Sequence, residues 1–435
     1  MLVVDYPEES LTAVTELLQD LCRIPQGLKV RVLFLSRQGL EQWRNVIAEA
    51  KALTLLDTTP ITVGPLDGEA AYSLFCSAQE SAAEITKTTP FPVAKGDFLN
   101  WLLDAPENHR ALFIVAAAVQ SALHTEESVF GYKGRDVVNA LVEREVAHLR
   151  VMATNLGMAD KDVFARLLAM AAIARALPLS YLEELVASGI GIGLNGVGSI
   201  RETLKDVGLL WEHAIHAPTP DILAANLAVM VLAAEPKAAP EVLWAAMIPD
   251  VSGGFERIGR LSYDAEVILG IHKYRLSRWC GEAVEGNATR CALLQPFVHA
   301  DVPLGCRDGA IGVCRTLATL GESREDVAAL LNDLSNHLAA VGDAGGALEA
   351  IREAVEIRRR LSRANPARFE PDLARSLGTL GRVLGKCEQY SEATAAFKEG
   401  VDIIRPFAEQ SPHGPAARLL KALENDLCLM RDMET

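Results

Sequence analysis

The sequence predicts a mainly α-helical protein that ends in an α-solenoid and begins with a small α/β unit. Half of the 435 residues are apolar, enough for cores in roughly two to four domains. Aromatic residues make up only 6% of the chain and strand-like runs of Val, Ile, Thr and Tyr are scarce, which favours helices. The last hundred or so residues repeat one apolar pattern, as a solenoid requires.

The beginning of the chain reads as a strand, a helix and a second strand. Residues 1–5 and 30–37 have the apolar, β-branched composition of buried strands, and the apolar residues of 11–21 between them have helical spacing. Such a βαβ unit has parallel strands in a sheet that is covered on both faces. Residues 53–56 and 61–63 are weak candidates for further strands.

This region resembles the second half of the nucleotide-binding domain of STAND-type signalling NTPases, bacterial relatives of the NB-ARC proteins. Residues 2–6 are similar to the Walker B strand, so the resemblance makes Asp5 the acid that binds the water of a cofactor Mg²⁺. Residues 33–37 are similar to the sensor strand, which makes Arg37 the cation near the γ-phosphate. Residues 109–113 stand where the family has a Gly-x-Pro-Leu turn, with His109 and Ala111 in place of Gly and Pro.

The sequence contains no Gly-x-x-x-x-Gly-Lys-Ser/Thr phosphate loop. That loop supplies the backbone N–H groups and the lysine that hold the β- and γ-phosphates. We therefore expect residues 1–140 to be a partial P-loop NTPase remnant, truncated at the Walker B strand and carrying a helical lid. The chain as it stands is not expected to be an enzyme, and ATP and Mg²⁺ are expected only if a missing N-terminal half completes the site.

Residues 141–236 read as short helices that are punctuated by Pro178, Pro218 and Pro220. Residues 207–223 resemble the β-wing and the next helix of the winged-helix domain of STAND proteins, with Asp221 as the helix N-cap. Because the net charge is -15 and no basic recognition helix is visible, we expect a regulatory packing domain and no nucleic-acid partner. Residues 237–321 are weakly patterned, and we expect an irregular helical linker there.

Residues 322–435 contain one structural unit written twice, followed by a partial third copy from about Leu419. Each unit has two helical stretches joined by a turn, at residues 342–345 and 385–388. At an offset of 46 residues the apolar positions align in pairs, Leu331 with Leu377, Leu334 with Leu380, Leu338 with Leu384, and Ile351 with Phe397.

This unit resembles the tetratricopeptide repeat, in the long form attached to bacterial STAND proteins. Ser335 stands in the first copy where the second has Gly381, and Ala344 where the second has Tyr390. The residues that the resemblance assigns to packing between helices are Leu334, Leu338, Ala347, Ile351, Ala354, Leu380, Gly381, Leu384, Tyr390, Ala393, Phe397 and Gly400.

Other motifs have a structural explanation. A Gly-x-Gly-x-x-Gly match at residues 191–196 follows a helical stretch rather than a strand, so we expect a turn between helices and not a dinucleotide loop. Three spaced pairs of possible zinc ligands each lack the second cluster that structural zinc requires, so buried thiols and solvated histidines are expected instead. These pairs are His213 with His216, Cys306 with Cys314, and His272 with Cys280.

The cysteines contain no CxxC pair, which favours reduced thiols and a cytoplasmic location. The longest apolar run, residues 222–234, is interrupted by Asn226 and is shorter than the roughly 20 residues of a membrane span. We therefore expect no membrane partner.

These patterns predict a protein-binding or regulatory module that uses the concave face of its repeats, within a STAND-like signalling protein with a degenerate nucleotide site. Helical stacks leave such a face exposed, so the expected partner is a protein or peptide. Packing of this face on the chain's own N-terminal domain is the alternative use. The alternative functions are a signalling ATPase whose Walker A half is missing from the chain, and a zinc or thiol enzyme.

Overall fold

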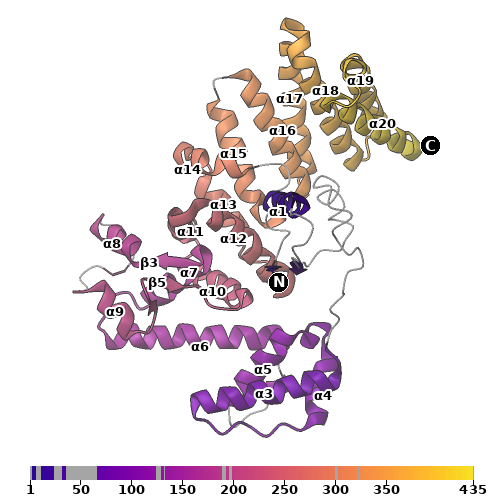
Figure 1. Ribbon diagram of the computed structural model, residues 1–435. Coiled ribbons are helices and arrows are strands. Elements are labelled where there is room, and N and C mark those ends of the chain that lie inside the picture. Colours follow the sequence, from indigo (N-terminus) through magenta and orange to yellow (C-terminus); the bar gives the residue numbers. More distant parts are fainter. Residues whose placement is uncertain are drawn as a thin grey trace. The chain divides into compact units, whose positions relative to one another are not determined.

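The computed structural model describes residues 2–5, 11–23, 32–35, 66–123, 129–131, 133–188, 193–194, 198–298, 302–321 and 323–434. These residues are mainly helical, which confirms the predicted class (Figure 1). The chain divides into two compact units, Met1–Gly134 and Arg135–Thr435. Unit 1 ends just before the predicted domain boundary at residue 140.

Unit 1 begins with a strand, a helix and a strand in the predicted order. β1 (Leu2–Asp5) and β2 (Val32–Leu35) pair in parallel and form a two-stranded sheet. The connecting helix α1 (Leu11–Arg23) buries Val14 and Leu18, which are four residues apart and so lie on one face. The further strand candidates at residues 53–63 lie outside the described residues.

From residue 66 onward, the described part of unit 1 is mainly helical and has an aromatic core. Phe98 lies 5.1 Å from Phe75 and 5.9 Å from Trp101, measured between ring centroids. The fully buried Asn108 donates to the Trp101 carbonyl and accepts from the Gly134 N–H, so both ends of its amide are satisfied. The elements are α3 (Gly68–Thr86), α4 (Lys95–Asp104), η2 (Pro106–His109), α5 (Ala111–Leu123) and η3 (Val129–Gly131).

Unit 2 begins with helices around a small antiparallel sheet with strand order β3-β5-β4. Leu177 and Ile215 pair at the centre of the sheet, and both are fully buried. The elements in chain order are α6 (Gly134–Asn155), α7 (Val163–Ala174), β3 (Ala176–Pro178), α8 (Leu179–Ala187), α9 (Ile200–Asp206), β4 (Leu210–Trp211), β5 (Ala214–His216) and α10 (Asp221–Ala234).

Asp221 is not the N-cap that the sequence suggested. Pro220 occupies the cap position and Asp221 is the first residue of α10. The Asp221 carboxylate instead binds two arginines of α12 (Val251–Tyr263), Arg257 at 2.6 Å and Arg260 at 2.5 Å. Arg257 is 4% exposed and also donates to the Ala172 carbonyl of α7 at 3.1 Å. This shielded cluster ties α7, α10 and α12 together.

One hydrophobic core extends from Val142 to Val313 and includes buried Cys280, Cys291 and Cys306. The segments predicted as a regulatory domain and a linker, on either side of residue 236, therefore share this core. The remaining elements of this part of the chain are α11 (Ala239–Met247), η4 (Ile248–Asp250), the π-helical turn η5 (Asp264–Ile268), α13 (Leu276–Val284), α14 (Ala288–Leu294), η6 (Gln295–Phe297), η7 (Leu304–Cys306) and α15 (Arg307–Leu320).

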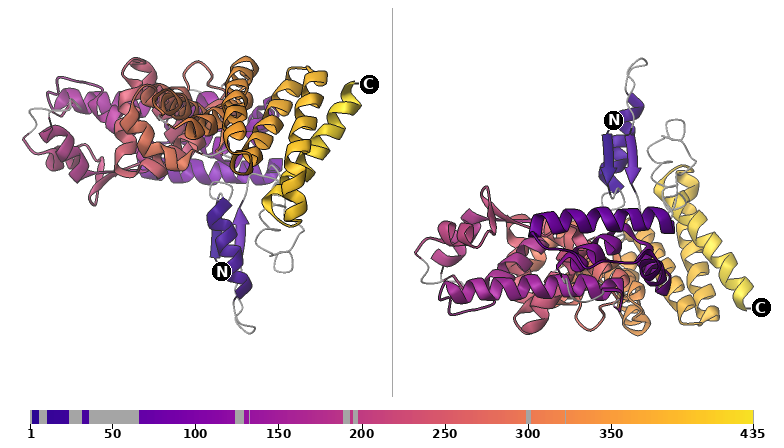
Figure 2. Two further views of the ribbon diagram at one scale, coloured as in Figure 1. Left: turned by 90° about the horizontal axis from the view of Figure 1, so that it is seen from above. Right: turned by 90° about the horizontal axis from the view of Figure 1, so that it is seen from below.

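The end of unit 2 is a helical repeat in which each helix packs on the next (Figure 1, Figure 2). Both ends of α17 recur in α19 after 46 residues, and the C-terminal ends of α16 and α18 are also 46 residues apart. The structure thus has the register that the sequence predicted. The helices are α16 (Arg324–Ala340), α17 (Ala344–Ala364), α18 (Pro366–Lys386), α19 (Tyr390–Gln410) and α20 (Pro415–Glu434).

The turns of the two copies repeat as well. Gly342 and Glu388 are 46 residues apart and both have a left-handed backbone, with φ of 88° and 60°. Glycine adopts this conformation without strain, whereas a side chain such as that of Glu388 costs roughly 1–2 kcal/mol. Asp343 then caps α17 by accepting from the Gly346 N–H at 2.9 Å.

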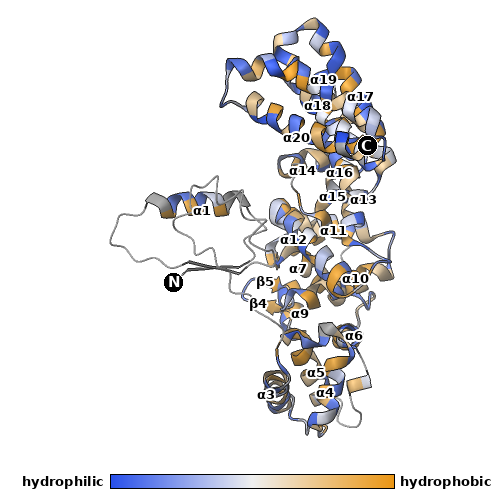
Figure 3. Cartoon of the chain, turned by 90° about the vertical axis from the view of Figure 1, so that its right-hand side faces the viewer, coloured by the Kyte–Doolittle hydropathy of each residue, from blue (hydrophilic) through white to orange (hydrophobic). Residues whose placement is uncertain are grey.

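Apolar and hydrophilic residues alternate around α16–α20 (Figure 3). Between the paired helices, a large residue on one helix lies opposite a small residue on the other. In the second copy a Cβ on Gly381 would come within 2.6 Å of the Phe397 ring. In the first copy the equivalent pair is Ser335 and Ile351, both fully buried. The Ser335 hydroxyl donates to the Ala347 carbonyl at 2.8 Å, so it is satisfied there. A smaller partner on α17 leaves room for the larger residue on α16.

We predict that Gly381→Ser lowers the opening free energy of α18 and α19 by roughly 1–3 kcal/mol, because the added side chain overpacks against Phe397. Adding Phe397→Ile restores part of the loss, since the pair then matches that of the first copy. Hydrogen–deuterium exchange of peptides from α18 and α19 measures both effects. Gly345→Ser, at an exposed site in α17, is the control and changes stability by less than about 0.5 kcal/mol. Additive losses in the double variant would contradict this explanation.

Candidate functional site

The described residues do not bring the predicted nucleotide-site residues together. Asp5 is the last residue of β1 and pairs with Leu35 of β2. Arg37 lies outside the described residues. His109 ends η2, and its Nδ1 lies 3.3 Å from the Leu66 carbonyl oxygen. The nucleotide site therefore stays a prediction from the resemblance.

Only residues 193–194 and 198 of the glycine-rich segment 189–198 are described. Gly193 has a positive φ of 81°, and a Cβ there would lie 2.9 Å from both the Asp160 carboxylate and the Val163 side chain. Backbone strain and close packing against the start of α7 therefore account for a glycine at this position.

The possible zinc ligands lie in different environments. His213, His216 and His272 are exposed, whereas Cys280, Cys306 and Cys314 are buried. Burial raises the pKa of the Cys306 and Cys314 thiols to about 12. Across the described parts of the chain, no cluster of three or more His, Cys, Asp or Glu residues could hold a metal ion. No described helix is long and apolar enough to cross a membrane.

The C-terminal helices form two rows. We call α16, α18 and α20 the inner row, in which each helix contacts the next member of the row. Gly378 and Gly385 of α18 allow this approach, because a Cβ there would lie 2.5 Å from Leu423 and 2.8 Å from Met430 of α20. The outer row, α17 and α19, is joined by two ion pairs between long side chains, Arg352 with Glu392 and Arg359 with Glu399. The closer approach within the inner row makes its side the concave one.

The predicted packing residues lie between the two rows. Leu380 and Tyr390 are half-buried, and the others are buried. The buried members are Leu334, Leu338, Ala347, Ile351, Ala354, Gly381, Leu384, Ala393, Phe397 and Gly400.

A buried polar network crosses the inner row, and sequence reasoning did not find it. Arg358 of α17 is 6% exposed and donates to the Ser376 hydroxyl at 2.5 Å and to the Asp372 carbonyl at 2.9 Å. Ser376 in turn donates to the Asn332 side-chain oxygen at 3.0 Å, which joins α18 to α16. The only signal in the sequence was three polar residues at positions where the repeat is otherwise apolar, at 332, 358 and 376. The network thus joins α17 to α18 through Arg358, and α18 to α16 through Ser376.

Charged side chains on the surface of the inner row form ion pairs between neighbouring helices. Arg368 binds Glu325 at 2.6 Å, and Arg382 lies 3.4 Å from Asp426. Asn336, Arg382 and Cys428 occupy equivalent positions in α16, α18 and α20, so they mark one line across the row. Amide, guanidinium and thiol groups along such a line offer hydrogen bonds to an extended chain, and they define the candidate site.

Comparison with protein-family models and with curated proteins finds no match for the chain. The candidate site therefore rests on the geometry of the inner row.

Asp333, half-buried on α16 beside the network, has a raised pKa because burial disfavours its charged form. A hydrogen bond from Asn332 and the nearby Arg358 and Arg375 oppose this shift. The folded chain thus holds the proton more tightly than the unfolded chain. The contribution of protonated Asp333 to the free energy of unfolding is fully present below the ordinary aspartate pKa of 3.8. It is lost as the pH rises through the raised pKa of the folded chain.

We predict that Asp333→Asn raises the melting temperature at pH 7, because the buried negative charge is removed while the shape is kept. The difference from the parent chain shrinks as the pH falls through the raised pKa of Asp333, because the parent carboxyl then becomes protonated. Differential scanning calorimetry at several pH values tests this. Asp402→Asn, an exposed aspartate on α19, serves as the control and has little effect at any pH. A variant that is less stable than the parent chain at pH 7 would overturn the assignment.

Proposed function

We propose that residues 322–435 are a tetratricopeptide-like module that binds a protein or peptide on the inner row of its helices. The observation that carries this proposal is the 46-residue repeat of helix ends, turns and packing positions. Stacked helix pairs bury a continuous core and expose one side of each helix along the stack. That arrangement suits recognition of an elongated partner.

The chemistry of the inner row supports a polar, extended ligand. Its line of equivalent positions carries Asn336, Arg382 and Cys428, which differ in charge and hydrogen bonding. The buried bonds of Arg358 to Ser376 and of Ser376 to Asn332 hold α16 and α18, which carry two of these residues, in position. A peptide that crosses the row would meet a different group on each helix, which is a basis for selectivity.

We propose further that the module belongs to a STAND-like regulatory protein. The order α7-β3-α8-α9-β4-β5, with sheet order β3-β5-β4, supports a winged-helix interpretation of the residues after 141. The parallel pair β1 and β2 supports an NTPase remnant at the start. In such a protein the repeats bind a partner and so control the other domains.

We predict that a photo-crosslinking residue at Asn336 or Arg382 captures the bound partner, whereas the same residue at Glu356 or Asp402 does not. Glu356 and Asp402 are exposed, equivalent positions on the outer row and form the matched control. Mass spectrometry of the crosslinked peptides from the full chain identifies the captured residues. Crosslinks to residues 1–134 of the same chain would show that the row packs internally. Equal capture from both rows would contradict the proposal.

A signalling ATPase is the second candidate function. It is favoured by Asp5, which ends one of two parallel strands, because ligands bind beyond the carboxyl ends of such strands. The first proposal predicts no heat on titration of the full chain with Mg-ATP. Micromolar binding that is lost in Asp5→Ala but kept in Glu16→Ala, an exposed residue of α1, would support the ATPase instead.

A further inference from the structure

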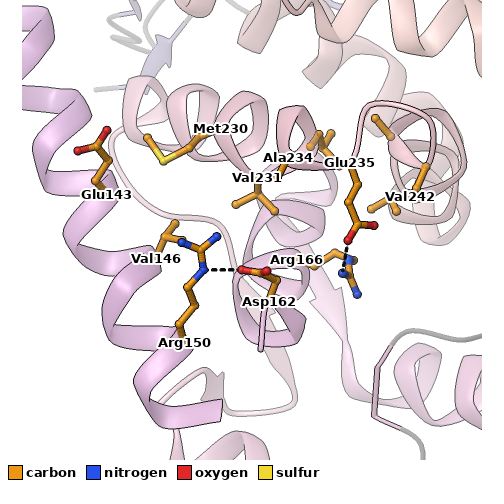
Figure 4. Close-up of a pocket in the computed structure, with 13 residues that line it drawn as sticks. Glu143, Val146, Arg150, Asp162, Arg166, Met230, Val231, Ala234, Glu235 and Val242 are labelled. Carbon is orange, nitrogen blue, oxygen red and sulfur yellow. Dashed lines mark hydrogen bonds and ion pairs between the residues drawn. The ribbon is translucent and has the colours of Figure 1, made fainter. Parts of the chain in front are cut away.

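A pocket separate from the repeat lies in unit 2 where α6 faces α7, α10 and α11 (Figure 4). Its volume is about 340 Å³, within the range of small-ligand sites. Its lining combines a largely apolar wall with five charged side chains. The charged members are Glu143, Arg150, Asp162, Arg166 and Glu235.

The space beside the apolar wall is left open because α6 presents short side chains to the core. Val146 is buried there, and its short side chain leaves space beside α10. Met230 and Val231 of α10 are only partly buried and form the opposite wall (Figure 4). Ala234, the last residue of α10, adds little side-chain volume at the exposed rim. The wall can therefore accept an alkyl chain.

The pocket is lined by three carboxylates and two guanidinium groups, so negative charge is in excess. Arg150 binds Asp162 at 2.6 Å. Arg166 binds Asp160 at 2.5 Å and lies 3.7 Å from Glu235. Both guanidinium groups thus already face carboxylates.

Glu143 lies on α6, across from Met230 (Figure 4). It accepts a hydrogen bond from the Asn139 amide at 2.8 Å. That neutral amide does not compensate the Glu143 charge. A cation beside an alkyl chain would therefore complement both the charge and the wall of the pocket.

We propose that this pocket binds a primary aliphatic ammonium, with its alkyl chain on Val146, Met230 and Val231 and its charge at Glu143. The ligand is either a free alkylamine or the lysine side chain of a partner, which share this chemistry. Because Glu143 lies on α6 and Met230 on α10, the bound ligand bridges these two helices. Binding then slows hydrogen exchange in α6, the helix that starts at the boundary between the two units.

The test is a ligand-observed NMR titration of the full chain with n-hexylammonium, methylammonium and n-hexanoate. We expect hexylammonium to bind more tightly than methylammonium, by about fourfold for each methylene that becomes buried. Hexanoate is expected to bind more weakly than hexylammonium. Comparable binding of methylammonium would show only that the chain, with its net charge of -15, attracts cations in general, and would overturn the proposal. Tighter binding of hexanoate would overturn it as well.

Two variants locate the site. Glu143→Gln weakens hexylammonium binding about two- to fivefold, as expected for an ion pair with an exposed carboxylate, while Glu183→Gln on the exposed face of α8 leaves it unchanged. Ala234→Phe fills the rim of the pocket and abolishes the advantage of hexylammonium over methylammonium. An unchanged advantage in Ala234→Phe would exclude this pocket.

Nα-acetyl-lysine methylamide distinguishes the two sources of the ammonium. Tighter binding of this compound than of hexylammonium assigns the pocket to the lysine side chain of a partner, and weaker binding assigns it to a free amine. Slower exchange of α6 peptides in the presence of the tighter ligand is expected in either case, and unchanged exchange would overturn the bridging role.

Discussion

The repeat depends on close contact between paired helices at positions that have almost no side chain. Ala347, Ala354 and Ala393 are fully buried, and Gly400 lies 46 residues after Ala354. Where a backbone meets a neighbouring helix this closely, the larger residues beside the contact, such as Phe397, are removed from water. Burying one such side chain contributes about 1.5–3 kcal/mol. A larger residue at any of these small positions would separate the two helices and expose the whole neighbouring cluster.

The first part of unit 2 is held together differently. Its helices vary in length and surround a three-stranded sheet, and one ion-pair cluster joins α7, α10 and α12. Asp221 gains from both Arg257 and Arg260, and those arginines would be costly to bury without it. Here specific polar contacts replace a repeated apolar pattern. The transition to the repeat lies at α15, which contributes buried residues to both cores.

Sequence reasoning succeeded where one physical pattern recurs. The register of the repeat was predictable because burial on one helix face forces apolar residues to return at a fixed spacing, as Leu338 and Leu384 do. The βαβ order was predictable because the two buried strands are apolar and β-branched and the helix between them has apolar residues at helical spacing.

The core of residues 237–321 was not predictable, because its packing depends on single contacts. One example is Gly259, where a Cβ would lie 2.6 Å from the Cys306 sulfur. Such a contact does not recur at a fixed spacing in the sequence, so no pattern predicts it. Arg358 was missed because a cation in a basic run is normally solvated, and its burial depends on two acceptors from another helix, the Asp372 carbonyl and the Ser376 hydroxyl of α18. The pocket beside α6 was missed because its lining comes from four helices that are distant in the sequence.

The buried thiols have a consequence for how this molecule can be observed. Cys428 is exposed, whereas Cys280, Cys306 and Cys314 are enclosed in protein. Only thiolates react rapidly with alkylating reagents, and burial disfavours the thiolate in all three enclosed residues. An added reagent therefore modifies Cys428 at once and reaches the enclosed sulfurs only when the surrounding helices separate. The rate at which the enclosed cysteines are alkylated therefore measures how often the helices around them open.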